Sequence, residues 1–176
     1  MNLMEMVIME KIKKDKLREI PLKNYIYLFL ILLGSILLLL YIYTWYETYH
    51  ENKLNTSIMN NYLTVINYNE LDNYIIENKN AIIYVSILGD ENINRFETKF
   101  KNDIVENNLK NTILYLDLTN ENKEVATKSL QIEQNFPYLV VYTNGNITDT
   151  YSIADTNYNS KKTIKYLNRI GATEDD

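Results

Sequence analysis

The chain has 176 residues, a net charge of −5, a single histidine and no cysteine. Without cysteine it cannot form disulfides, carry out thiol redox chemistry or bind zinc through thiolates, and one histidine excludes a histidine-rich metal site. The excess of acidic residues, with no evident basic face, argues against nucleic-acid binding. We therefore expect no metal, no cofactor and no nucleic-acid partner.

Residues 25–46 form an uncharged apolar run, YIYLFLILLGSILLLLYIYTWY. As a helix this run would be about 33 Å long, enough to cross a hydrocarbon core of roughly 30 Å. Tyrosine and tryptophan lie at its two ends, as at membrane interfaces. Six basic residues precede the run and only Lys53 follows it closely, so the positive-inside rule predicts a cytoplasmic N-terminus and an extracytoplasmic C-terminal part.

Two alternatives to a membrane span remain for this run. A buried core helix is disfavoured because the run is apolar on all faces. A cleaved signal peptide is disfavoured because the run is longer than the usual apolar region and no small-x-small cleavage site follows it. We therefore predict an uncleaved signal anchor in a bilayer. The expected segments are a basic cytoplasmic segment (1–24), the transmembrane helix (25–46), a stalk (47–62), a globular domain (63–171) and an acidic tail (172–176).

The first half of the domain alternates strand and helix patterns. Residues 63–66 are a short strand candidate, and Asn67 and Glu70 have the spacing of a capping box at the start of a helix. Residues 81–87, AIIYVSI, form a near-continuous apolar run typical of a strand covered on both faces. A second helix follows, with apolar residues at spacings of three and four. These residues are Ile93, Phe96, Phe100 and Ile104.

The second half ends in a hairpin and a helix. Residues 112–118 predict another buried strand, and a short polar helix is expected around 121–130. Residues 137–151 predict a hairpin with Asn144-Gly145 as its two-residue turn. A last helix is expected between Ser160, as N-cap, and Gly171, as its stop. The order β-α-β-α-β-α-β-β-α predicts an α/β fold: a mixed sheet flanked by helices, with the first three strands parallel.

Two stretches of this domain resemble the thioredoxin-like fold over about residues 63–171. AIIYVSILGDENINRFETKF (81–100) resembles its central strand, active-site loop and following helix. IEQNFPYLVVYTNGNI (132–147) resembles its cis-proline strand and final hairpin, with Pro137 at the cis-proline position. Membrane-anchored bacterial relatives, such as proteins similar to bacteriocin-transport accessory proteins, combine one span with such an outer domain. The alternative is that Pro137 follows a trans peptide bond and is simply the first residue of an edge strand.

The chain departs from active members of that family at the loop. Their Cys-x-x-Cys motif corresponds to Asp90, Glu91, Asn92 and Ile93, and Tyr84 lies near the place of the carboxylate that is often buried on the central strand. The resemblance therefore implies a domain without thiol–disulfide exchange. We expect that the protein is not an enzyme.

The loop at residues 89–93 has a structural and a functional interpretation. In the structural one, Gly89 permits the tight turn, Asp90 caps the helix and Glu91 adds a favourable first-turn charge. A catalytic carboxylate pair is disfavoured because adjacent residues at a helix start point in different directions. In the functional interpretation, the loop and the cis-proline strand form a shallow groove for an extended peptide. Its predicted residues are Gly89, Asp90, Glu91, Asn92, Ile93, Phe136 and Pro137.

The sequence thus predicts a redox-inactive, membrane-anchored extracytoplasmic module that binds a protein or an extended peptide. The alternative is a scaffold subunit of a membrane complex that acts through its transmembrane helix and stalk, where Gly34-Ser35 offers a small-residue site for helix packing.

Overall fold

The computed structural model describes residues 4, 6 and 21–172. Most of the predicted basic segment (1–24) and all but Ala172 of the predicted acidic tail lie outside the described residues. The chain divides into two compact units, Met1–Tyr49 and His50–Asp176. Each unit is considered by itself below, and the predicted limits of the stalk and the globular domain stay predictions.

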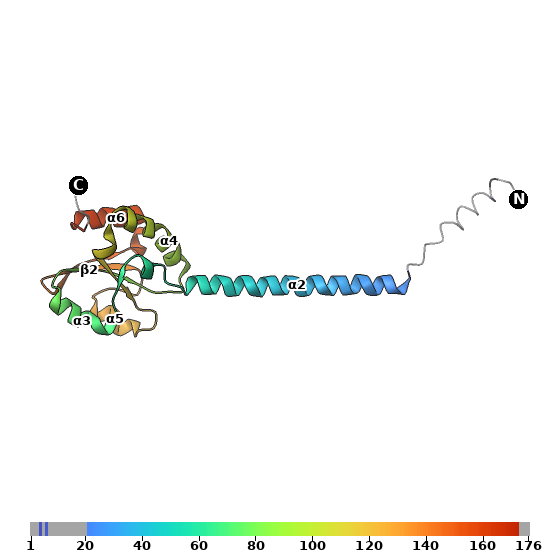
Figure 1. Cartoon of the computed structure of the whole chain (residues 1–176), viewed down its shortest axis with the longest axis horizontal. Coiled ribbons are helices and arrows are strands. Elements are labelled where there is room, and N and C mark those ends of the chain that lie inside the picture. The colour runs from blue at the N-terminus through green and yellow to red at the C-terminus, as the bar shows by residue number, and fades with distance from the viewer. Residues whose placement is uncertain (1–3, 5, 7–20, 173–176) are drawn as a thin grey trace. The chain divides into compact units, whose positions relative to one another are not determined.

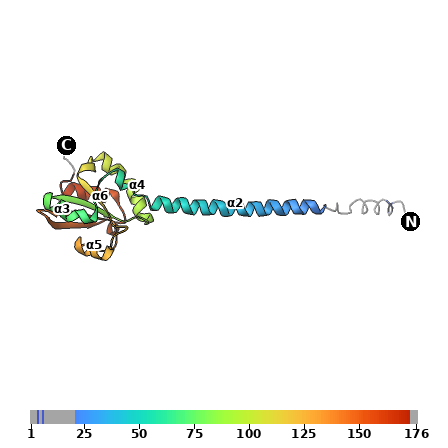
Figure 2. The same ribbon diagram turned by 60° about the horizontal axis from the view of Figure 1, so that its bottom comes forward.

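The first unit is dominated by helix α2, Leu22–Leu54, which continues into the second unit. Figures 1 and 2 show α2 as one uninterrupted helix. It contains the predicted span 25–46, and none of its residues is buried. By length and composition it is the one helix among residues 4, 6 and 21–172 that is apolar enough to cross a membrane. A helix that is apolar all round and uncovered by protein is suited to a lipid environment or to a partner helix.

The second unit contains the alternating elements that the sequence predicts. In chain order they are β1 (Thr64–Val65), α3 (Tyr68–Glu77), β2 (Ala81–Ser86), α4 (Glu91–Glu106), β3 (Ile113–Asp117), α5 (Lys123–Ser129), β4 (Tyr138–Thr143), β5 (Asn146–Ser152) and α6 (Ser160–Arg169). Short 3-10 turns lie at Met59–Asn61, Leu109–Asn111 and Ala154–Thr156. The predicted order of strands and helices is confirmed.

The strands form a five-stranded mixed sheet in the order β1-β3-β2-β4-β5. Strand β3 is parallel to both β1 and β2, while β4 is antiparallel to β2 and to β5. Figure 1 shows α4 and α6 on one face of the sheet and α3 and α5 on the other. Helices on both faces explain why β2 and β3 are near-continuous apolar runs rather than alternating ones.

Each face of the sheet has its own apolar core. Under α4 and α6, the rings of Tyr84 and Tyr115 from the sheet pack with Phe96 and Phe100 from α4, at centroid distances of 5.0 to 6.4 Å. Met59, before β1, is completely buried in the same cluster. The opposite core joins α3 and α5 to the apolar side chains of the other strand face. The central strand β2 therefore contributes to both cores.

Local details confirm the predicted turn and the predicted N-cap Asn67, move the N-cap of α6 by one residue, and show that the capping box at α3 does not form. Asn144 and Gly145 both have positive φ, 54° and 79°, as a two-residue hairpin turn requires. The N-cap of α6 is Asn159 and not Ser160, because the Asn159 side chain accepts a hydrogen bond from the Lys162 N–H at 3.1 Å. Asn67 is the N-cap of α3, but its amide donates to the Glu70 carboxylate at 2.9 Å and does not cap a backbone N–H.

Candidate functional site

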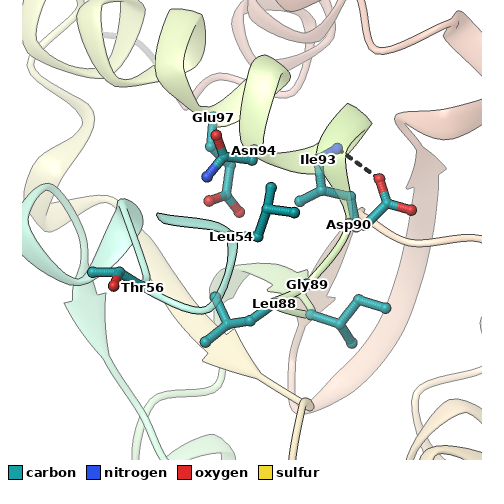
Figure 3. A pocket seen from close by; sticks show the side chains of 9 residues that line it. Leu54, Thr56, Leu88, Gly89, Asp90, Ile93, Asn94 and Glu97 are labelled. Atoms are coloured by element: carbon teal, nitrogen blue, oxygen red, sulfur yellow. Dashed lines mark hydrogen bonds between the residues drawn. The ribbon is translucent and has the colours of Figure 1, made fainter. Parts of the chain in front are cut away.

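The loop between β2 and α4 is organised by Asp90. Gly89 has a φ of +87°, a left-handed conformation that favours glycine, and Asp90 follows as the N-cap of α4. The Asp90 Oδ1 atom accepts hydrogen bonds from the N–H groups of Asn92, at 2.7 Å, and Ile93, at 3.0 Å. Figure 3 shows the second of these bonds. The predicted role of Asp90 as a helix cap is confirmed.

The neighbours of Asp90 differ in exposure. Glu91 and Asn92 are exposed, and the Glu91 carboxylate pairs with Arg95 one helical turn later. The Ile93 side chain is buried in the apolar core on the α3 and α5 face. Because one carboxylate caps the helix and the other pairs with an arginine, the two acids of the loop do not converge on one point.

The cis-proline strand reaches the same end of the sheet. The Phe136–Pro137 peptide bond is cis. The antiparallel register pairs Tyr138 with Val85, and continuing it by one residue places Pro137 beside Ser86, near the start of the loop. Phe136 and Pro137 are both buried, and Phe136 belongs to the same apolar cluster as Ile93. The structure thus brings the seven predicted groove residues to one end of the sheet, with three of their side chains buried.

The C-terminal end of α2 packs against this loop, which the sequence analysis did not predict. Lys53 and Leu54 belong to the same compact unit as the sheet. The Gly89 N–H donates to the Leu54 carbonyl at 3.1 Å, and the Asn94 side-chain amide donates to the Lys53 carbonyl at 3.3 Å. Figure 3 shows the Leu54 side chain between α4 and the Leu88–Gly89 backbone. This segment covers part of the predicted groove.

A buried carboxylate lies below the loop. Glu97, on α4, is only 2% exposed, and its Oε1 atom accepts hydrogen bonds from the Tyr84 hydroxyl and the Ser86 hydroxyl, both at 2.9 Å. Burial is the main cause that raises the pKa of Glu97 to about 7; the two hydrogen bonds lower it and the Asp117 carboxylate raises it. A carboxyl group with this pKa titrates near neutral pH although it lies inside the domain.

Glu97 is a site residue that sequence reasoning missed. The central strand has Tyr84 where the resemblance leads us to expect a carboxylate, and the structure supplies the carboxylate from α4 instead. The available signal was its position: Glu97 follows Ile93 by four residues and precedes Phe100 by three, which places it on the apolar face of the helix. An ionisable residue on such a face is a candidate for a buried hydrogen-bonded group.

A second polar contact holds the loop from the side of β3. The Leu88 N–H donates to the Thr119 hydroxyl oxygen at 2.7 Å, and that hydroxyl donates to the Asp117 carboxylate. Asp117 also accepts from the Thr119 N–H at 2.8 Å. The loop is thus held on three sides, by the Lys53–Leu54 segment, by Thr119 and by the α4 cap.

The group of this site that is able to hold a proton is enclosed by the domain. Glu97 is able to hold a proton, but the hydroxyl groups of Tyr84 and Ser86 that contact it are themselves buried. Within residues 4, 6 and 21–172, no group of three or more histidine or acidic side chains is placed to hold a metal ion. The part of the loop that solvent reaches is the first turn of α4, where Glu91 and Asn92 are exposed.

Replacing Glu97 with glutamine should change how stability depends on pH. A folded-state pKa of about 7 lies above the ordinary value of 4.5, so protonation favours the folded state. This stabilisation is present below pH 4.5 and is lost as the pH rises through about 7. At 1.36 kcal/mol per unit, the free energy of unfolding of the unmodified protein should fall by about 3 kcal/mol more than that of Glu97→Gln between pH 4.5 and pH 8. Urea denaturation across this range measures the difference, and parallel pH profiles for the two proteins would contradict the assignment.

Removing the Asn94 side chain should loosen the loop. Asn94→Ala deletes the hydrogen bond to the Lys53 carbonyl, a bond worth about 1 kcal/mol, so hydrogen exchange of the Gly89 amide should become about fivefold faster. Exchange can be followed by mass spectrometry of a peptide that covers the loop. Asn92→Ala is the matched control, because Asn92 is exposed on the same helix. Equal exchange in both variants would show that the Lys53 contact does not hold the loop.

No protein-family model matches this chain, and no curated protein sequence matches it. Among solved structures, thioredoxin f2 of Chlamydomonas reinhardtii matches with a TM-score of 0.50 and 12% identity, covering 64% of this chain and 99% of the thioredoxin. Thioredoxins of Fasciola hepatica and Plasmodium falciparum match with 19% identity each and TM-scores of 0.45 and 0.47. They cover 61% of this chain and 98% and 97% of their own.

The likeness to thioredoxin f2 concerns the fold alone, because the identity is low. Together with the five-stranded sheet and its helices on both faces, it identifies the fold class predicted from the sequence. The chain has no cysteine, so the dithiol chemistry of a thioredoxin is not available to it. The globular part is a cysteine-free domain with a thioredoxin-like fold, preceded by a helix that is long and apolar enough to cross a membrane.

Proposed function

We propose that this protein is a redox-inactive, membrane-anchored, extracytoplasmic accessory module that binds a protein or an extended peptide and is not an enzyme. The observation that carries the proposal is a thioredoxin-like domain without cysteine whose β2–α4 loop leaves Glu91 and Asn92 exposed to solvent. Without thiols the domain cannot carry out a redox step, but the surface formed by the loop and the cis-proline strand would still be available to bind a partner. A binding role therefore needs no residue that the chain lacks.

The loop and the cis-proline strand form the proposed binding surface. Glu91 and Asn92 are exposed, so they would make side-chain contacts with the partner. The buried side chains of Ile93, Phe136 and Pro137 would support the surface, and the backbone just before Pro137, ahead of the start of β4, would pair with an extended peptide. The Leu54 side of the loop is already covered, which confines the partner to the side of Asn92.

The membrane anchor in this proposal is α2. Its uncharged centre is long enough for a bilayer, and basic residues are concentrated before it in the sequence. With the N-terminus in the cytoplasm, the thioredoxin-like domain would stand on the extracytoplasmic side. The domain would then meet exported or surface proteins near the membrane.

One observation favours a second candidate, a scaffold subunit of a membrane complex. The side chains of α2 are exposed along the apolar run, and an added Cβ at Gly34 would have no heavy atom within 4 Å. A glycine on an uncovered apolar helix allows a second helix to approach closely. In this case the partner would contact the span, and the loop would serve only as a structural turn.

The orientation can be tested with single introduced cysteines, since the natural chain has none. In intact cells, a membrane-impermeant maleimide should label Lys128→Cys on α5, while Lys13→Cys should be labelled only after the cells are permeabilised. Both labelled products should have the mass of the uncleaved chain. Labelling of Lys13→Cys from outside would contradict the orientation, and a product that lacks the first 46 residues would contradict the anchor.

The binding surface can be tested by site-specific photo-crosslinking in native membranes. A photoreactive residue at Asn92 should capture a discrete partner protein, because this position is exposed beside the loop. The matched control is Lys128, which is also exposed but lies on α5 at the other face of the sheet. Capture by a probe at Gly34, with none at Asn92, would favour the scaffold function.

A further inference from the structure

A groove outside the loop lies between the last helix and the last strand. It has a volume of about 270 Å³ and is lined by Tyr151 from β5 and by Lys162, Lys165, Tyr166 and Arg169 from α6. We call it the α6–β5 groove. It shares no residue with the loop surface proposed above.

The floor of the groove is aromatic and held in place. The rings of Tyr151 and Tyr166 are stacked, with centroids 4.3 Å apart and an interplanar angle of 15°. The Tyr166 hydroxyl donates to the Asp149 Oδ2 atom at 3.0 Å, which connects α6 to β5 a second time. A fixed pair of rings gives a ligand a flat apolar surface without a large loss of side-chain entropy.

The rim of the groove is basic. Lys162, Lys165 and Arg169 follow at spacings of three and four on α6, so they lie on one face of the helix, and all three are exposed. The Arg169 guanidinium lies 5.0 Å from the centre of the Tyr166 ring and 3.8 Å from the Asp149 carboxylate. Within residues 21–172, Asp149 is the one carboxylate in contact with these three cations, so the groove formed by these residues is positive on a chain whose net charge is −5.

The groove lies beside an open edge of the sheet. Strand β5 is the last strand in the sheet order, and among the described residues it pairs only with β4. It is seven residues long, whereas β1 at the opposite edge has two. Asp149 and Tyr151 point to the α6 face, as their contacts with Tyr166 show. The Thr150 N–H already donates to the Asp149 carboxylate at 2.9 Å. A long unpaired edge presents further N–H and C=O groups to which another strand can bond.

We propose that the α6–β5 groove binds an acidic, extended segment of a partner protein, which adds as a sixth strand to β5 and places carboxylates against Lys162, Lys165 and Arg169. In a strand, every second side chain points to the same face, at intervals of about 6.6 Å. The three cations are spaced along α6 by roughly 4.5 and 6 Å, within the reach of flexible side chains. A segment with an acidic residue at every second position therefore matches both the edge and the rim.

The shape of the site favours a peptide over a lipid surface. A bilayer is flat and offers no backbone groups to pair with β5, whereas an extended peptide satisfies the edge and enters the groove at once. The methylene groups of the acidic side chains that face α6 would lie over the aromatic floor. Charge gives the site its preference for acidic sequences and makes binding sensitive to salt.

The test uses the full chain in phosphatidylcholine nanodiscs and a fluorescein-labelled peptide, acetyl-Glu-Val-Glu-Tyr-Glu-Val-Asp-amide. Fluorescence anisotropy should show saturable binding, and Lys165→Glu should weaken it by about tenfold through charge reversal. Lys161→Glu is the matched control, because Lys161 is exposed on the same helix but does not line the groove. It should leave the affinity within about twofold of the unmodified protein.

Two further measurements distinguish strand addition from nonspecific electrostatic attraction. The same peptide with alternate backbone amides methylated keeps its charge but cannot complete a strand, so it should bind about tenfold more weakly. Phosphatidylglycerol vesicles test the lipid alternative by co-sedimentation. The proposal is overturned if the peptide shows no saturable binding up to about 1 mM. It is also overturned if Lys161→Glu and Lys165→Glu weaken peptide binding equally. The same holds if Lys165→Glu abolishes vesicle binding but leaves peptide binding unchanged. Crosslinking at Asn92 is independent of each of these results.

Discussion

Strand β2 is bonded on both edges and covered on both faces, and the remaining elements are arranged around this constraint. It pairs in parallel with β3 and antiparallel with β4, and it contributes side chains to both apolar cores. Glu97 fastens α4 to it by two buried hydrogen bonds, to Tyr84 and Ser86. The loop of the candidate site begins where β2 ends. Because β2 is held in a buried position, the start of the loop is held in place as well.

At the end of β2, a carboxylate of this chain neutralises the partial positive charge at the start of α4. The start of a helix carries unsatisfied N–H groups and a partial positive charge, which a thiolate complements in an active thioredoxin-like protein. Here the Asp90 carboxylate accepts two of those N–H groups directly. A carboxylate at this place is satisfied and unreactive toward disulfides. The helix therefore begins at a capping carboxylate, and no thiol is present for disulfide exchange.

The order of elements could be predicted from the sequence because each carries a strong local pattern. The run at residues 81–87, the spacing of Phe96 and Phe100, and the Asn144-Gly145 turn each depend on neighbouring residues alone. Glu97 was missed because its burial depends on partners eleven and thirteen residues away on another element. The packing of Leu54 on Gly89 was missed for the same reason, since a backbone hydrogen bond leaves no trace in side-chain pattern. The N-cap of α6 was misplaced by one residue because Asn159 and Ser160 are both good capping residues.

The attachment of Leu54 to Gly89 has a mechanical consequence. Tension that passes along α2 enters the globular domain through Lys53 and Leu54, whose carbonyl groups are bonded to Asn94 and Gly89. The first bonds to bear that load are therefore those at the start of α4, and not those within the sheet. The sheet is protected behind them, because its strands are linked by ladders of hydrogen bonds that share a load. A pull on α2 would act first on the loop and only later on the sheet.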